Sequence, residues 1–207
     1  MLLCDVGNTS YHFYDTETGR DYRRPAEGFD PQTVKRRVYY ICVNAAAAEA
    51  LCAADGWVDI EPFVDRTRYY DTMGIDRIAA CEAVDEGVIV DAGSAITVDV
   101  VEAGKFAGGF IVPGLAAMHE AYRRLSPRLD HSFNFDMPLD KMPTNSADAL
   151  TYGAAGLLAF RVRAFRMRVL LTGGDAQKLL PLFPDAEYAP LLLFEGMQKI
   201  ITKAEPC

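Results

Sequence analysis

The chain begins with Met1-Leu2-Leu3-Cys4-Asp5-Val6-Gly7-Asn8-Thr9, an apolar run that ends in an aspartate and a glycine turn. Its apolar start predicts a buried strand that reaches Asp5, and the alternating residues 10–15 predict a second strand that returns beside the first. The same order recurs later in the chain, where an apolar strand leads into Asp91-Ala92-Gly93-Ser94-Ala95 and a returning strand follows. Two matched units of strand, aspartate, glycine turn and strand predict two lobes of one topology facing each other across a central cleft.

Beyond these turns, strands and helices alternate in both halves of the chain, which predicts an α/β fold. The junction between the halves falls near residues 85–87, so we expect an N-terminal lobe over residues 1–84 and a C-terminal lobe over residues 85–207. The main helices are expected over residues 45–54, 74–83, 115–125, 146–166 and 190–203.

Composition limits the possible partners. Lys and Arg number 21 against 29 Asp and Glu in 207 residues, so the net charge is −8. Such a chain repels nucleic acid backbones and anionic membranes, and we expect neither as a partner. The start of the chain has no basic segment typical of a secretory signal, and no apolar run approaches the ~20 residues of a membrane helix.

The cysteines Cys4, Cys42, Cys52, Cys81 and Cys207 form no C-x-x-C pair. Their odd number and mostly apolar surroundings are typical of reduced thiols in a cytoplasmic protein.

The two aspartate turns suggest a chemical role. Turns of glycine and small polar residues direct backbone N–H groups at anions, and the side chains of Asn8, Thr9, Ser10 and Ser94 add donors. A carboxylate beside such a turn repels phosphate directly, but it can hold phosphate through a cation. One Asp-x-Gly turn alone is most simply a hairpin, whereas two matched copies after buried strands favour phosphate binding. Neither a P-loop nor a dinucleotide-binding glycine motif occurs.

With these residues placed, the chain resembles the type III pantothenate kinases, which belong to the superfamily of acetate kinase, sugar kinases, Hsp70 and actin. The likeness rests on five motifs in order: Asp5-Val6-Gly7-Asn8-Thr9, Gly74-Ile75-Asp76-Arg77, Asp91 to Asp99, Gly108 to Gly114, and Thr172-Gly173-Gly174-Asp175. Each is weak alone, but their shared order and spacing make the resemblance strong. It implies two ribonuclease H-like lobes with mixed sheets, the actin-like ATPase fold.

The resemblance also implies an activity: ATP-dependent phosphorylation of pantothenate, the first step of coenzyme A synthesis, by a homodimer that needs magnesium and a monovalent cation, potassium or ammonium. Asp76 would be the general base, Asp91 would hold the monovalent cation, and Asp5 would face magnesium. The acceptor would be bound by Tyr70, Gly74, Ile75, Asp76, Arg77 and Ser146. The ATP phosphates would lie along Asp5, Val6, Gly7, Asn8, Thr9, Ser10, Tyr11, His12 and Ser94.

The sequence is compatible with alternatives for three of these features. The segment before Gly74 looks shortened relative to the family, so the substrate tyrosine is Tyr69 or Tyr70, with Tyr70 favoured. The small residues 153–156 suit either a dimer face or a buried helix. A superfamily kinase or phosphatase with another acceptor, and a non-catalytic regulator on the same fold, remain as alternatives.

Overall fold

The computed structural model describes residues 1–204 and divides the chain into two compact units. Of the described residues, 1–84 and 191–204 belong to the first unit and 85–190 to the second. The prediction of a lobe over residues 85–207 was therefore wrong for the C-terminal helix α7 (Leu192–Ala204). This helix packs on α2 (Ile75–Ala83) of the first unit and buries Phe194, Met197 and Ile200.

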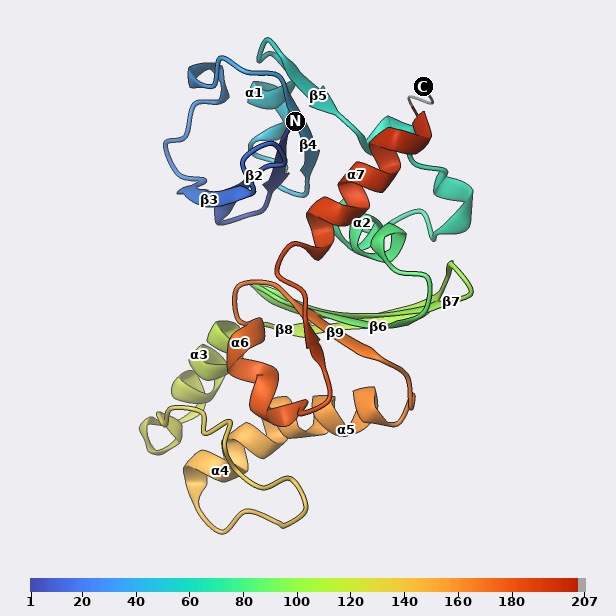
Figure 1. The fold of residues 1–207 in the computed structure, drawn as a ribbon. Helices are drawn as coiled ribbons and strands as arrows, with labels where there is room; N and C mark the ends of the chain where they lie inside the picture. Colours follow the sequence, from blue (N-terminus) through green and yellow to red (C-terminus); the bar gives the residue numbers. More distant parts are fainter. Residues whose placement is uncertain (205–207) are drawn as a thin grey trace. The chain divides into compact units, whose positions relative to one another are not determined.

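The first unit is built on a five-stranded mixed sheet (Figure 1). Its strands lie in the order β3 (Arg20–Pro25), β2 (Ser10–Asp15), β1 (Leu2–Val6), β4 (Val38–Cys42) and β5 (Trp57–Asp59). The β1–β2 and β2–β3 pairs are antiparallel, whereas β1–β4 and β4–β5 are parallel. The carboxyl ends of β1 and β4 therefore meet at one edge, where the first glycine turn begins.

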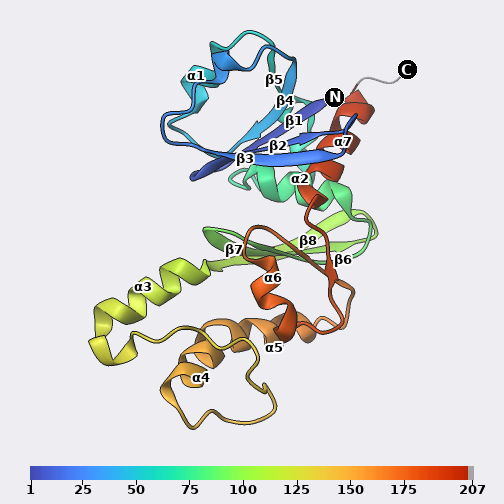
Figure 2. The same ribbon diagram turned by 60° about the vertical axis from the view of Figure 1, so that its left-hand side comes forward.

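Alternation along the strands gives this sheet two apolar faces. Leu2, Cys4 and Val6 point into a core shared with α1 (Ala48–Cys52), and Leu3 lies on the opposite face. That opposite face is covered by α2 and α7, and both ribbon views show α1 and the α2–α7 pair on different sides (Figures 1 and 2). Short 3-10 helices at Pro31–Thr33, Glu61–Phe63 and Arg66–Arg68 complete the unit.

The second unit repeats the plan, with strands in the order β10-β9-β6-β7-β8. Their bounds are β6 (Gly87–Ala92), β7 (Ala95–Glu102), β8 (Lys105–Pro113), β9 (Val169–Thr172) and β10 (Glu187–Tyr188). Again the first three strands form antiparallel pairs, and the first strand pairs in parallel with a later one. The matched topology confirms the α/β fold with mixed sheets that the repeated turns predicted.

Helices cover one face of this second sheet. They are α3 (Leu115–Leu125), α4 (Ser146–Thr151), α5 (Leu157–Arg163) and α6 (Ala176–Leu179), with 3-10 turns at Pro127–Leu129 and Leu180–Leu182. The expected single helix over residues 146–166 instead holds a π-helical turn at Tyr152–Gly156, between α4 and α5. Ala154, Ala155 and Gly156 are buried within the unit, so most of the small-residue run packs against its own core.

The helix expected over residues 45–54 is shorter, because Asn44 directs a turn before it. The Asn44 Oδ1 atom accepts the Ala46 N–H at 3.0 Å, and Ala47 N–H bonds back to the Asn44 carbonyl at 3.0 Å. These bonds hold residues 44–47 in a turn, and α1 begins only at Ala48.

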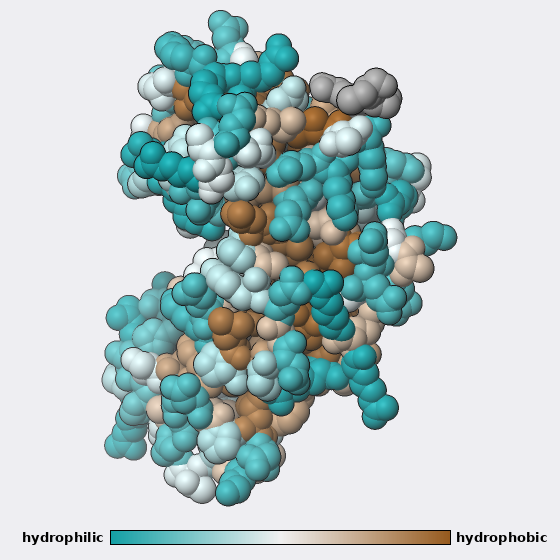
Figure 3. All heavy atoms as spheres, in the orientation of Figure 1, coloured by the Kyte–Doolittle hydropathy of each residue, from teal (hydrophilic) through white to brown (hydrophobic). Residues whose placement is uncertain are grey.

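Hydrophilic side chains cover much of the face drawn in Figure 3. Within residues 1–204, no helix is both long and apolar enough to cross a membrane. Among the described residues, Cys4, Cys42, Cys52 and Cys81 form no disulfide, and Cys207 lies outside the described residues.

Candidate active site

The first glycine turn is held from three sides. Gly7 N–H donates to the Ser10 carbonyl at 3.0 Å and closes the turn, while Ala26 N–H donates to the Thr9 carbonyl at 3.0 Å. The Asn44 side-chain amide donates to the Gly7 carbonyl at 3.2 Å. Asn8 and Thr9 at the tip are exposed. The backbone is thus fixed, and the tip can accept a ligand.

The residues predicted to line the ATP phosphates divide between the two faces of the sheet. Val6 and Tyr11 are buried in the apolar core, and the Tyr11 ring lies 4.3 Å from that of Phe29. Their side chains are therefore directed away from the turn, and only their backbone groups are available to a ligand. Asp5 and His12 pair directly across β1 and β2 on the opposite face.

His12 is a packed residue. Its Nε2 atom lies 3.1 Å from the Asp21 carboxylate, and its ring stands edge-on to Phe194 at 4.8 Å. Burial lowers the pKa of His12, and the nearby Arg23 guanidinium lowers it further against the opposing effect of Asp21.

The acceptor motif begins helix α2. Gly74 has extended backbone angles, and the Asp76 carboxylate folds back over it to accept the Arg77 N–H at 2.8 Å. A Cβ at position 74 would lie 2.4 Å from Asp76 Oδ1, so only glycine leaves room for this carboxylate. Burial raises the pKa of Asp76, although the Arg77 N–H and guanidinium favour the charged form.

The acceptor motif lies close to the first turn within the same unit. The Cβ position of Gly74 is 3.8 Å from Val43 Cγ1, and Val43 N–H donates to the Val6 carbonyl at 3.1 Å. Val43 and Asn44 therefore connect the start of α2 to the turn that follows β1. The helical pattern over residues 45–54 does not reveal this role of Asn44. Its position just after a strand parallel to β1 is the signal that could have found it.

The structure separates the two neighbouring tyrosines. Tyr69 is 8% exposed, and its hydroxyl donates to Glu82 at 2.7 Å. Tyr70 is 44% exposed, and the buried Arg77 guanidinium contacts both its hydroxyl and its ring. Tyr69 is thus a packing residue, whereas Tyr70 and Arg77 together offer a polar surface to a ligand.

Glu82 is a second feature that the sequence did not reveal. The Glu82 side chain is 6% exposed, and its carboxylate accepts from the adjacent Arg68 and Tyr69 and from Lys203 of α7, so two segments meet on it. These bonds lower the pKa of Glu82 against the effect of its burial. The network fastens residues 68–70 to α2 and α7 and so holds Tyr70 beside Arg77.

In the second unit, three turns meet at the end of β6. Gly93 N–H donates to the Ala95 carbonyl at 2.9 Å, and Gly114 N–H donates to the Ser94 carbonyl at 3.1 Å. Asp175 N–H donates to the Ala92 carbonyl at 2.8 Å. The predicted motifs at 91–95, 108–114 and 172–175 therefore converge within this unit.

Two oxygen atoms of this turn lie close together beside the Gly173 backbone. A Cβ added to Gly173, whose φ is +90°, would lie 2.3 Å from Asp91 Oδ1 and 2.5 Å from the Ala92 carbonyl oxygen. A carboxylate and a carbonyl so placed suit a hard cation. Among residues 1–204, no group of three or more His, Cys, Asp or Glu side chains is arranged for a metal ion. Magnesium at a nucleotide needs only one or two carboxylates, because phosphates and waters supply the rest.

Ser146, also predicted to contact the acceptor, is the first residue of α4 in the second unit and is exposed. Asn145 caps this helix, since its side chain accepts the Asp148 N–H at 2.9 Å.

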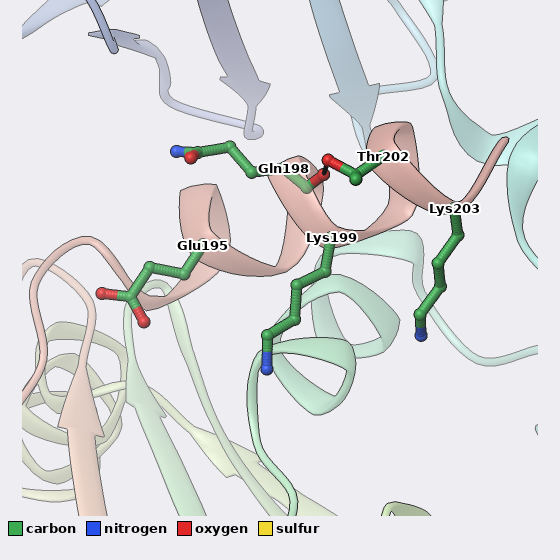
Figure 4. Close-up of a pocket in the computed structure, with 5 residues that line it drawn as sticks. All are labelled: Glu195, Gln198, Lys199, Thr202 and Lys203. Carbon is green, nitrogen blue, oxygen red and sulfur yellow. Dashed lines mark hydrogen bonds between the residues drawn. The ribbon is translucent and has the colours of Figure 1, made fainter. Parts of the chain in front are cut away.

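One open depression of about 490 Å³ lies along α7 in the first unit (Figure 4). It is lined by Glu195, Gln198, Lys199, Thr202 and Lys203. Lys199 donates to the Ala83 carbonyl at 2.8 Å, and Lys203 binds Glu82, so both lysines join α7 to α2. None of the predicted site residues lines it, and we assign it no part in catalysis.

Comparisons with known proteins show the family of the chain. A family profile described as type III pantothenate kinase matches residues 29–166. A type III pantothenate kinase from Sulfurimonas denitrificans is 52% identical over 207 residues, which cover 100% of both chains.

Two solved structures are similar to the chain as well. A Campylobacter jejuni crystal structure that bears the name Baf family transcriptional activator is 36% identical, covers 98% of each chain and has a TM-score of 0.85. Component A of the (R)-2-hydroxyglutaryl-CoA dehydratase of Acidaminococcus fermentans is 13% identical with a TM-score of 0.53, covers 99% of each chain and supports the actin-like ATPase fold alone. On the strength of the family profile and the full-length relative, the chain belongs to the type III pantothenate kinase family.

Proposed function

We propose that this protein transfers the γ-phosphoryl group of ATP to the primary hydroxyl of pantothenate, the first step of coenzyme A synthesis. One observation carries the proposal beyond family membership. The Gly74–Arg77 motif, with its half-buried Asp76 carboxylate, lies beside the glycine turn after β1, connected through Val43. A base and a phosphate cradle next to each other in one unit are what phosphoryl transfer to an alcohol requires.

Asp76 takes the role of general base. The attacking hydroxyl becomes acidic only as its bond to phosphorus forms, so a carboxylate can accept the proton late in the reaction. The raised pKa of Asp76, caused mainly by burial, makes it a stronger base than an exposed aspartate. The Arg77 N–H also holds the Asp76 carboxylate in place, so this side chain loses little conformational freedom when the substrate binds.

The two turns take the phosphates. Backbone N–H groups and the side chains of Asn8, Thr9, Ser10 and Ser94 would donate to phosphate oxygens. Asp5 would hold magnesium, and Asp91 with the Ala92 carbonyl would hold potassium or ammonium. When bound, these cations neutralise charge on the phosphates during transfer.

Arg77 and Tyr70 would receive the acceptor, with backbone help from Gly74 and Ile75 and a hydroxyl contact from Ser146. Pantothenate carries a carboxylate, and a forked guanidinium matches a carboxylate in geometry as well as in charge. The buried Arg77 is held by Tyr70, so its guanidinium is already oriented before the substrate arrives.

The direct test is a coupled assay of ADP release from ATP and magnesium, run with and without potassium. We expect turnover with pantothenate, stimulated by potassium, and none with acetate or hexoses. Turnover with acetate or a sugar instead would identify a superfamily kinase with another acceptor. Absence of turnover with every acceptor, in protein that binds ATP, would favour a regulator, the activity named for the Campylobacter jejuni structure.

We expect Arg77→Lys to raise KM for pantothenate by about tenfold, because a buried bidentate contact to a charged group is worth about 1.5–3 kcal/mol. The lysine keeps the charge but loses the fork and its contact with the Tyr70 ring. Since Arg77 does not touch the reacting hydroxyl, kcat should change less than threefold. Steady-state kinetics with varied pantothenate at saturating ATP measure both, and an unchanged KM would remove Arg77 from acceptor binding.

We further propose that the protein is a homodimer in the cytoplasm. Leu157 and Phe160 are 57% and 40% exposed on α5, next to the buried run at residues 154–156. Apolar side chains on one exposed helix face suit self-association through a two-fold interface.

Leu157→Glu is accordingly expected to shift the mass measured by light scattering from a dimer to the 22.8 kDa monomer. Leu125→Glu is the matched control, because Leu125 is 75% exposed on a different helix and should leave the dimer intact. A dimeric Leu157→Glu variant would place the interface elsewhere.

A further inference from the structure

We infer that Arg23 on β3 is an additional phosphate-contacting residue of the nucleotide site, serving the turn at residues 7–10. The inference rests on the proposed function in its use of ATP. It adds a cation to a cradle that otherwise consists of backbone N–H groups, hydroxyls and an amide.

Strand register brings Arg23 to the correct face. Asp5 pairs with His12 across β1 and β2, and His12 pairs with Arg23 across β2 and β3. Residues directly opposite in a sheet point to the same side. Arg23 therefore shares the face of Asp5 and not that of the core residue Tyr11.

Two contacts join Arg23 and its strand to the glycine turn. The Arg23 Nη1 atom lies 3.5 Å from Ser10 Oγ, the hydroxyl at the end of the turn. Just beyond β3, Ala26 N–H donates to the Thr9 carbonyl at 3.0 Å. The guanidinium is therefore positioned by the same backbone that positions the turn.

The charge of Arg23 is available to a ligand. Arg36, Arg66 and Arg68 of the first unit pair with Asp15, Glu61 and Glu82. Within the described residues 1–204, no carboxylate lies within 4.0 Å of the Arg23 guanidinium nitrogens. The nearby Asp21 instead binds His12. An exposed cation beside a phosphate cradle, in a chain of net charge −8, provides the local attraction that the overall charge does not.

The chemistry of the ligand follows from this arrangement. The pKa of His12 is lowered, first by its burial and second by Arg23. Near neutral pH, the positive charge among the paired residues Asp5, His12 and Arg23 therefore comes from Arg23. A guanidinium beside hydroxyl and backbone donors matches the oxygens of a nucleoside polyphosphate. Arg23 would contact only the phosphates, so it should not change the affinity for adenosine.

The simpler alternative is that Arg23 is an ordinary solvated arginine, and the chain offers a matched control. Arg24 is the next residue of the same strand and is equally classed as exposed. It lies opposite Tyr11, and its guanidinium lies over the Tyr22 ring at 5.8 Å, on the other face of the sheet. Arg23→Gln and Arg24→Gln thus remove the same charge at adjacent positions.

The test compares ADP with adenosine by titration calorimetry for the wild type, Arg23→Gln, Arg23→Lys and Arg24→Gln. Loss of one charged contact predicts an ADP affinity about tenfold weaker in Arg23→Gln. Adenosine affinity should stay unchanged, Arg23→Lys should lose less than Arg23→Gln, and Arg24→Gln should match the wild type within about twofold. In turnover assays, Arg23→Gln should raise KM for ATP and not KM for pantothenate.

Equal ADP affinity in Arg23→Gln and wild type, or an equal loss in Arg24→Gln, would overturn the inference. Because Arg23 is exposed, both variants should fold, and melting curves check this. The ADP titration needs no acceptor. A wild type that binds ADP but does not phosphorylate pantothenate would therefore refute the proposed function and leave the role of Arg23 testable.

Discussion

Asp76→Asn should lower kcat for pantothenate phosphorylation by about 10²-fold or more, the usual effect of removing a general base. Asparagine keeps the size of the side chain and an oxygen for the Arg77 N–H, so the start of α2 should remain intact. It cannot accept the proton of the attacking hydroxyl. KM for ATP should change little, because the phosphate turns lie on other segments. Initial rates at saturating substrates measure the effect.

The pH profile sharpens this prediction. A base must be deprotonated to act, and burial raises the pKa of Asp76 above its ordinary value. Wild-type kcat should therefore fall as the pH drops through this raised pKa, so the acidic limb lies at higher pH than for an exposed aspartate. Asp76→Asn should lose that limb.

Asp71→Asn serves as the control, because Asp71 is exposed and only five residues away. It should keep wild-type kcat and the wild-type pH profile. Near-wild-type turnover in a folded Asp76→Asn protein would exclude Asp76 as the base.

Structural elements that depend only on neighbouring residues could be predicted from the sequence. The two strand–turn–strand units follow from apolar runs that end in Asp-x-Gly, and the structure confirms both hairpins. The start of α2 at the Gly74 motif was also predicted correctly. In each case, local alternation or a local turn is enough to determine the element.

Features that depend on distant residues were not predictable. The sequence of residues 190–204 does not predict that α7 packs on the first unit, because its apolar face would suit the core of either unit. The π-helical turn at Tyr152–Gly156 interrupts a continuous helical pattern, and its own sequence does not distinguish it from an α-helix. The network at Glu82 joins residues more than 100 positions apart, since Lys203 lies in α7.

The candidate site shows the same division. The motif aspartates could be named from sequence, whereas the choice between Tyr69 and Tyr70 required the burial of Tyr69 against Glu82. Likewise, Arg23 is one of several arginines in its segment, and only the register of β3 distinguishes it from Arg24.

Gly196→Ala is expected to lower the free energy of unfolding by about 2–3 kcal/mol, within the usual range for overpacking a filled interior. Gly196 lies in α7 where it crosses α2, and a Cβ there would lie 1.7 Å from the Ala79 carbonyl oxygen. Backbone cannot move aside as a flexible side chain can, so the two helices would have to separate. Both ribbon views show the helices side by side (Figures 1 and 2).

The sign of this effect separates packing from helix propensity. Alanine inside a helix is favoured over glycine by about 1 kcal/mol, so propensity alone predicts a more stable protein. Gly174→Ala is the steric control, because a Cβ at Gly174 meets nothing within 4 Å. Urea unfolding of both variants measures the difference. Since α2 carries Asp76 at its start, a shift of α2 should also lower kcat in Gly196→Ala. A Gly196→Ala protein at least as stable as the wild type would mean that α7 does not approach α2 this closely and does not hold the start of α2 in place.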